Sequence, residues 1–215
     1  PTIAPRFRPA SPQDCQRIRR RYGLPKQYLL HVGRLDRKKD ITLVVEAFAK
    51  YARSINPVYG GKLLIVGGQY AKSQDLNLGP TLERLGVKDK VIFSGRVPDA
   101  DLPAMYSGAQ MTILASRHEG FGLAAIEALA CGTPLVANRT GAIPEVVGEA
   151  ALLIENMDQA KLAQTIHELI SNPRKRKQYQ QRGLDQARKY QNYQDAESIL
   201  SCYQAISNFD KDDII

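Results

Sequence analysis

Six short apolar runs recur along the chain, and each is separated from the next by a segment long enough to hold a helix. Hairpin turn signals are almost missing between them, so the runs are not expected to pair as antiparallel neighbours. Strands that alternate with helices form a parallel sheet covered on both faces, and right-handed crossovers make it doubly wound. The sequence therefore predicts an α/β, Rossmann-like fold. The predicted strands are residues 28–32, 62–66, 91–93, 111–115, 135–137 and 151–154.

The segments around these runs have the marks of helices. Apolar residues recur at helical spacing in residues 41–51, and Ser11 followed by Pro12 is typical of a helix start. A chain of 215 residues is long enough for one domain with a sizeable core. The predicted helices are residues 12–22, 41–51, 80–85, 99–107, 123–131, 158–171, 173–190 and 195–207.

Glycine-rich and charged loops follow four of the predicted strands. In a doubly wound sheet, ligands bind at the carboxyl ends of the strands, near the point where the strand order reverses. All the residues with suggestive chemistry fall on that edge, so a single site is expected there. The loops are residues 33–39, 67–68, 96–97 and 117–122.

The loop after the fourth strand combines features of an anion site and a polyol site. Gly120 and Gly122 flank Phe121, so the backbone can turn sharply and approach a ligand closely. The first amides of the helix that follows lack partners and favour an anion. Glu119 lies on the loop and Glu127 lies more than a turn into that helix, so both can face one crevice. This arrangement suits a ligand that is part phosphate and part polyol.

Three stretches carry a family resemblance: Glu-Gly-Phe-Gly-Leu at residues 119–123, Glu-Ala at 127–128, and Ala-Cys-Gly-Thr-Pro-Leu-Val at 130–136. Together they resemble the signature of the retaining glycosyltransferases of family 4 (glycosyl transferases group 1), which include sucrose and mannosyl transferases. The resemblance implies a GT-B fold, in which two Rossmann-like domains face each other across a cleft.

The resemblance runs from about Pro5 to the end of the chain and implies the carboxyl-terminal, donor-binding half of such an enzyme. Residues 1–12 are then expected to be a remnant of the interdomain linker, and residues 13–194 the nucleotide-sugar-binding domain. Residues 195–215 are expected to be a helix that crosses to the amino-terminal domain, followed by a tail. That acceptor-binding domain is expected to be missing.

A glycine and two separated cations follow the first predicted strand. From the residues alone, Arg34 and Lys39 are either a cationic clamp on a diphosphate or part of a solvated basic turn. The resemblance favours the clamp, because Gly33-Arg34-Leu35 and Lys39 match the phosphate-binding motif of the family. Asp40 stands where the family often has glycine, a mild departure.

The two glutamates differ in their surroundings. Glu127 has apolar neighbours, so its carboxylate needs either a ligand's hydroxyl groups or a structural partner such as an arginine or an amide. By resemblance, Glu127 holds the ribose hydroxyls of the nucleotide and Glu119 contacts the transferred sugar. The resemblance also implies donor-binding roles for Gly33, Arg96, Val97, Gly120, Phe121, Gly122 and Leu123.

The net charge of +8 raises the question of a nucleic-acid partner. No aromatic-rich strand motif or zinc-finger spacing accompanies the basic clusters, so they are expected to be solvated helix faces and no nucleic acid is expected. Attraction to a diphosphate, or to an anionic membrane surface, accounts for the same charge. Three widely spaced cysteines form no disulfide framework, which favours a cytoplasmic location. Peripheral association with the inner face of the membrane is a second expectation.

Two stretches suggest a metal or cofactor motif, but their sequence context supports neither. Asp99-Ala100-Asp101 resembles the Asp-x-Asp metal site of the other major transferase fold, but Asp99 precedes a short helix and is expected to cap it. Gly67-Gly68 lacks the Gly-x-Gly-x-x-Gly pattern of nicotinamide and flavin sites. No metal and no cofactor are expected, and a nucleotide-diphosphate sugar of the GDP-mannose or UDP-glucose type is the expected substrate.

The resemblance implies transfer of a hexose, mannose or glucose, to a hydroxyl acceptor, with Arg34, Lys39 and Glu119 as catalytic residues. Without the acceptor domain, the isolated chain is expected to be inactive. Two alternatives stay open: a nucleotide-sugar epimerase or phosphorylase of the same fold, and a non-catalytic module that binds nucleotides or nucleic acid.

Overall fold

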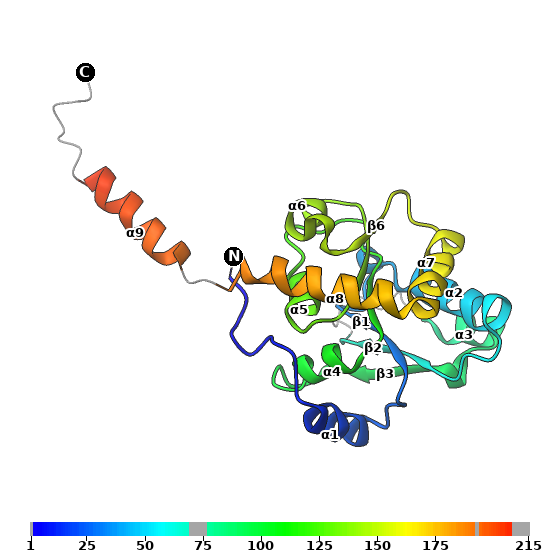
Figure 1. Cartoon of the computed structure of the whole chain (residues 1–215). Helices are drawn as coiled ribbons and strands as arrows, with labels where there is room; N and C mark the ends of the chain where they lie inside the picture. Colours follow the sequence, from blue (N-terminus) through cyan, green and yellow to red (C-terminus); the bar gives the residue numbers. More distant parts are fainter. Residues whose placement is uncertain (1, 69–76, 192–193, 208–215) are drawn as a thin grey trace.

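The centre of the molecule is a six-stranded parallel sheet with the strand order β3-β2-β1-β4-β5-β6 (Figure 1). The computed structural model describes residues 2–68, 77–191 and 194–207. The predicted doubly wound α/β fold is confirmed. The strands are β1 (Tyr28–Val32), β2 (Lys62–Val66), β3 (Val91–Gly95), β4 (Met111–Leu114), β5 (Leu135–Asn138) and β6 (Leu152–Ile154).

The strand order reverses between β1 and β4. The chain first builds the sheet outward from β1 through β2 to β3, and then returns to place β4 on the other side of β1. Leu29 is in register with Met111, and Leu30 with Thr112. The carboxyl ends of β1 and β4 therefore form the topological switch point, where ligands bind in folds of this kind.

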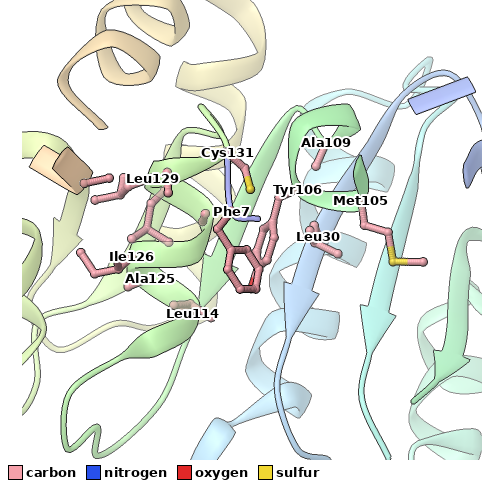
Figure 2. Packing of buried hydrophobic residues seen from close by; sticks show 14 of the residues in the cluster. Phe7, Leu30, Met105, Tyr106, Ala109, Leu114, Ala125, Ile126, Leu129 and Cys131 are labelled. Carbon is pink, nitrogen blue, oxygen red and sulfur yellow. The ribbon is translucent and has the colours of Figure 1, made fainter. Parts of the chain in front are cut away.

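Side chains alternate along β1 and so divide the core into two layers. Leu29 packs into a cluster under α2 (Ile41–Lys50), α3 (Gly79–Leu85) and α7 (Gln159–Ser171). Leu30 faces the opposite layer, where it lies near Tyr106 and Met105 (Figure 2). That layer is covered by α1 (Pro12–Tyr22), α4 (Leu102–Gly108), α5 (Leu123–Ala130), α6 (Ile143–Val147) and the end of α8 (Pro173–Arg188).

Most predicted elements are present within a residue or two of their predicted bounds. Strands β1 and β2 and helix α1 have the predicted ends, and Ser11 caps α1 by accepting from the Asp14 amide. Helix α6 was not predicted as an element, and neither was the π-helical turn Tyr51–Ile55 that extends α2. Both are single turns, too short to show a hydrophobic period.

The prediction that Asp99 caps a helix was wrong. Helix α4 begins at Leu102, and Asp101 holds the N-cap position without a side-chain cap hydrogen bond. Asp99 instead forms an ion pair with Arg6 at 3.0 Å. The Asp101 carboxylate is buried and accepts a 2.7 Å hydrogen bond from the Tyr22 hydroxyl, which joins α1 to the start of α4.

The two ends of the described chain differ in how they pack. The amino-terminal segment, predicted to be a linker, lies against the domain: Ile3 and Phe7 are buried, and the Ile3 amide donates to the Tyr190 carbonyl at 2.8 Å. Helix α9 (Gln194–Ser207) projects away from the sheet in Figure 1, and Leu200 and Tyr203 are exposed. The predicted tail beyond residue 207 lies outside the described residues.

Three features of the described ranges concern membranes, cysteines and metals. No helix there is both long and apolar enough to cross a membrane. Cys15, Cys131 and Cys202 carry free thiols. The same part of the chain contains no group of three or more His, Cys, Asp or Glu side chains placed to hold a metal ion.

Candidate functional site

The loop after β1 forms one 3-10 turn, and this turn sets the direction of Lys39. The Asp36 carboxylate begins the turn and accepts a hydrogen bond from the Lys39 amide at 3.1 Å. The Arg34 guanidinium lies 3.5 Å from the same carboxylate, and the Arg34 side chain is 63% exposed. Arg34 therefore lies at the rim of the sheet edge, whereas Lys39 turns inward.

Two ion pairs join this loop to the loop after β4. The Lys39 Nζ lies 2.6 Å from the Glu119 Oε2, with both side chains more than four-fifths buried. The next residue repeats the pattern: Asp40 accepts a 2.8 Å bond from the Arg117 guanidinium. The Arg117 amide also donates to the Lys38 carbonyl at 2.8 Å. Segments 80 positions apart in sequence thus meet at the switch point, as the strand order requires.

Asp40 stands where the family often has glycine, so an Asp40→Gly variant tests what the aspartate contributes to the stability of the loop. Its φ of 46° is a left-handed conformation that favours glycine, so Asp40→Gly relieves strain. The same change removes the ion pair with Arg117, whose side chain is 72% exposed, so the pair is expected to contribute little. We expect these effects to offset, and the Tm of Asp40→Gly to stay within about 3 °C of the parent in differential scanning calorimetry.

Asn156 provides the matched control, because it has nearly the same backbone conformation, φ 47°, on an exposed turn. Asn156→Gly keeps the Asp40 ion pair and should leave the Tm unchanged or slightly raised. A fall of more than about 6 °C for Asp40→Gly alone would contradict the expectation. It would show that the second ion pair is a main support of the loop.

The start of α5 has the sharp turn that the glycines predict. Gly122 caps the helix with φ 88°, and a Cβ there would lie 2.5 Å from Ile143 Cδ1. Gly120 is exposed, and Leu123, the first residue of α5, is 53% exposed. The Phe121 ring packs edge-on against Tyr190, with the ring centres 5.8 Å apart. Phe121 thereby anchors the turn to the segment just after α8, while the Leu123 side chain at the α5 amino terminus stays exposed.

A cleft of about 560 Å³ lies beside these loops at the carboxyl ends of β1, β2 and β3. Its walls include Gly33, Arg34, Arg96 and Val97, all predicted as site residues. The close approach of two loops forms its floor: Gly67 has φ 145°, and a Cβ there would lie 1.8 Å from the Gly33 carbonyl oxygen. Only glycine fits this position.

Glu127 lies farther along α5 and has a partner that the sequence did not suggest. The Tyr106 hydroxyl donates to its Oε2 at 2.9 Å, so the structural partner is neither an arginine nor an amide. Burial raises the pKa of the Glu127 carboxyl, and the Tyr106 hydrogen bond lowers it. The charge of Asp99, a residue that lines the cleft, raises the same pKa, and Arg6 lowers it.

The predicted site residues thus fall in three neighbouring groups at one edge of the sheet. Lys39 and Glu119 are in direct contact. The second group lines the cleft, and the third forms the turn into α5 together with Glu127. Three features were missed: the Asp40–Arg117 ion pair, the close approach at Gly67, and Tyr106. A tyrosine in a short apolar helix gives no signal that separates it from an ordinary core residue.

The chain is similar in sequence to part of several longer proteins. It is 37% identical over 167 residues to mannosylfructose-phosphate synthase from Agrobacterium fabrum, a match that covers 75% of this chain and 36% of that protein. The chain spans between about a third and a half of the length of the curated relatives it matches.

Solved structures give the same answer for the fold. Sucrose-phosphate synthase from Thermosynechococcus elongatus superimposes with a TM-score of 0.79 at 28% identity, over 94% of this chain and 50% of that one. The Anabaena protein HepE, in a complex with UDP, superimposes with a TM-score of 0.80 at 25% identity, over 91% of this chain and 54% of that one.

A family model described as glycosyl transferases group 1 matches residues 14–186. That range begins within α1, ends near the end of α8, and contains the ion-paired loops, the cleft and the turn into α5. The chain belongs to the glycosyl transferases of group 1 and has the Rossmann-like fold of their GT-B structures.

Proposed function

We propose that the chain is the donor-binding half of a retaining hexosyltransferase that takes its sugar from a nucleoside diphosphate. In the complete protein, the sugar passes to a hydroxyl group held by an amino-terminal domain. The partial coverage of the relatives supports this division of the enzyme. The presence of UDP in the similar HepE structure supports a nucleotide donor.

The observation that carries the proposal is the Lys39–Glu119 contact beside the open start of α5. A cation and a carboxylate in direct contact, next to the first turn of a helix, match the parts of a sugar diphosphate. Arg34 and the glycine backbone of the neighbouring cleft extend the same surface. We infer that a bound diphosphate replaces Glu119 as the ion-pair partner of Lys39. The Glu119 carboxylate can then contact the sugar.

Catalysis then depends on position and charge. Arg34 and Lys39 stabilise the negative charge that grows on the departing diphosphate, and the α5 amides add to this effect. Glu119 stabilises the positive charge that develops at the anomeric carbon. Glu127 holds the ribose, and the backbone at Arg96 and Val97 contacts the nucleobase, so that the donor has one orientation.

A thermal-shift titration tests the proposal. UDP, GDP, UDP-glucose and GDP-mannose are compared with uridine and guanosine, and the expected result is a rise in Tm for at least one nucleoside diphosphate. The matching nucleoside gives a smaller rise because it lacks the diphosphate. The rise should persist in EDTA, since side-chain cations neutralise the diphosphate. No stabilisation by any nucleoside diphosphate at millimolar concentration would contradict the proposal.

A further inference from the structure

Tyr106 occupies a position behind the proposed ribose site. It lies on α4, its side chain is fully buried, and its hydroxyl is 2.9 Å from the Glu127 Oε2. An ionised carboxylate can only accept hydrogen bonds, so the tyrosine is the donor. Because Tyr106 has no exposed surface, it cannot touch a ligand itself and can act only through Glu127.

The surroundings of Tyr106 hold its ring in one place. The Phe7 ring meets it edge-on at 6.3 Å between ring centres, and Figure 2 shows these two rings side by side near Leu30. The Tyr106 carbonyl accepts a 2.7 Å hydrogen bond from the Thr133 hydroxyl. A hydroxyl on such a fixed support is a directional constraint on any side chain that it contacts.

Glu127 needs such a constraint. Its side chain spans several rotatable bonds and lies in largely apolar surroundings between α4 and α5. With Oε2 held by Tyr106, rotation of the carboxylate is restricted, and Oε1 stays available to a ligand. Two vicinal hydroxyls bind well only where the acceptor oxygens have fixed positions and directions. A carboxylate that rotates freely would meet this requirement less well.

We propose that Tyr106 is a positioning residue that orients the Glu127 carboxylate to accept hydrogen bonds from the vicinal ribose hydroxyls of the nucleotide. This inference rests on the proposed function. It means that a residue that does not contact the ligand contributes to the specificity for ribose. It predicts that the Tyr106 hydroxyl affects binding only of ligands that carry those hydroxyls.

Several groups besides Tyr106 act on the pKa of the Glu127 carboxyl. Arg6 from the amino-terminal segment and Asp99 before α4 act on its pKa in opposite directions, and burial raises it. Cys131, at the end of α5, also interacts electrostatically with Glu127, but burial raises the pKa of its thiol, which stays neutral. Loss of the Tyr106 hydrogen bond therefore raises the Glu127 pKa further.

The test compares Tyr106→Phe with the parent chain by isothermal titration calorimetry. The probes are UDP and GDP and their 2′,3′-dideoxy counterparts. Tyr106→Phe is expected to lose about tenfold in affinity for the tighter ribonucleotide, the size expected for one bond to a charged group, and less than about twofold for its dideoxy form. As the pH falls, the affinity of Tyr106→Phe for the ribonucleotide should begin to decline at a higher pH than that of the parent.

Tyr28→Phe is the matched control. Tyr28 is also fully buried, and its hydroxyl donates to the Met105 carbonyl of the same helix α4 at 2.7 Å. This variant loses an equivalent buried hydroxyl without touching Glu127. It is expected to keep the parent's preference for ribose and the parent's pH dependence, even if its Tm falls as far as that of Tyr106→Phe.

The outcomes separate the two claims. If the parent binds neither UDP nor GDP, the proposed function fails and this inference fails with it. If the parent prefers ribonucleotides and Tyr106→Phe keeps the full preference, the inference alone is overturned. Equal losses for ribose and dideoxy ligands in Tyr106→Phe also overturn it, because they would indicate only a structural role for the hydroxyl.

Discussion

Replacing Lys39 with methionine is expected to weaken nucleoside diphosphate binding about 100-fold. This is near the upper end of the loss expected when one charge-assisted hydrogen bond is removed. Lys39 is the partly buried cation of the site, with 18% of its side chain exposed, so solvent screens it little. Methionine keeps most of the aliphatic stem and removes the charge. The dissociation constant measured by isothermal titration calorimetry reports the loss directly.

Lys38 is the natural control for this variant, since it is the preceding residue and its side chain is exposed. Lys38→Met removes the same formal charge and should change the affinity by less than about twofold. If both variants lose equal affinity, net charge rather than a positioned ammonium attracts the ligand. If Lys39→Met binds as tightly as the parent, the proposed diphosphate contact is wrong.

The second large effect is expected at the floor of the cleft. Gly67→Ala should lower the free energy of unfolding by more than about 3 kcal/mol, because strain and a backbone clash act together. The φ of 145° is almost closed to alanine, and the new methyl group would lie 1.8 Å from the Gly33 carbonyl oxygen. Urea denaturation measures the change, and nucleotide affinity should fall in the same variant.

Gly60 supplies the comparison, because a Cβ there would have no atom within 4 Å and the residue is exposed. Gly60→Ala is expected to change stability by less than about 1 kcal/mol. A Gly67→Ala chain of parental stability and affinity would show that the loops at Gly33 and Gly67 separate at little energetic cost. The cleft described here would then be only one of several loop arrangements.

The sequence predicted the fold well because its signals are local. Apolar runs such as residues 28–32 and 62–66 are too short for typical helices and are typical of buried strands, and the structure has them at those bounds. Asp99 shows the limit of a local signal. An acidic residue before a short helix is typical of a cap, but the helix begins only at Leu102, and Asp99 pairs instead with Arg6, 93 positions away.

The sequence could predict at which edge of the sheet the candidate site lies. It could not predict which side chains contact each other there. Parallel topology places Lys39 and Glu119 on one edge, which the order of elements alone indicates. Their direct ion pair depends on the 3-10 turn begun by Asp36, which only the coordinates reveal. Tyr106 was missed for a related reason: its role lies in one hydroxyl, and hydrophobic patterning cannot detect that.

The strand order β3-β2-β1-β4-β5-β6 also affects how the chain reaches its native state. The walls of the site come from segments about 80 residues apart, which meet only after β4 has docked on β1. Such distant parallel pairing is a slow, late step in folding. Under the proposed function, early folding intermediates have no site for the nucleotide, and only the finished sheet can bind it. Added nucleotide is then expected to slow cleavage of β1 and β4 by proteases that attack the opened chain.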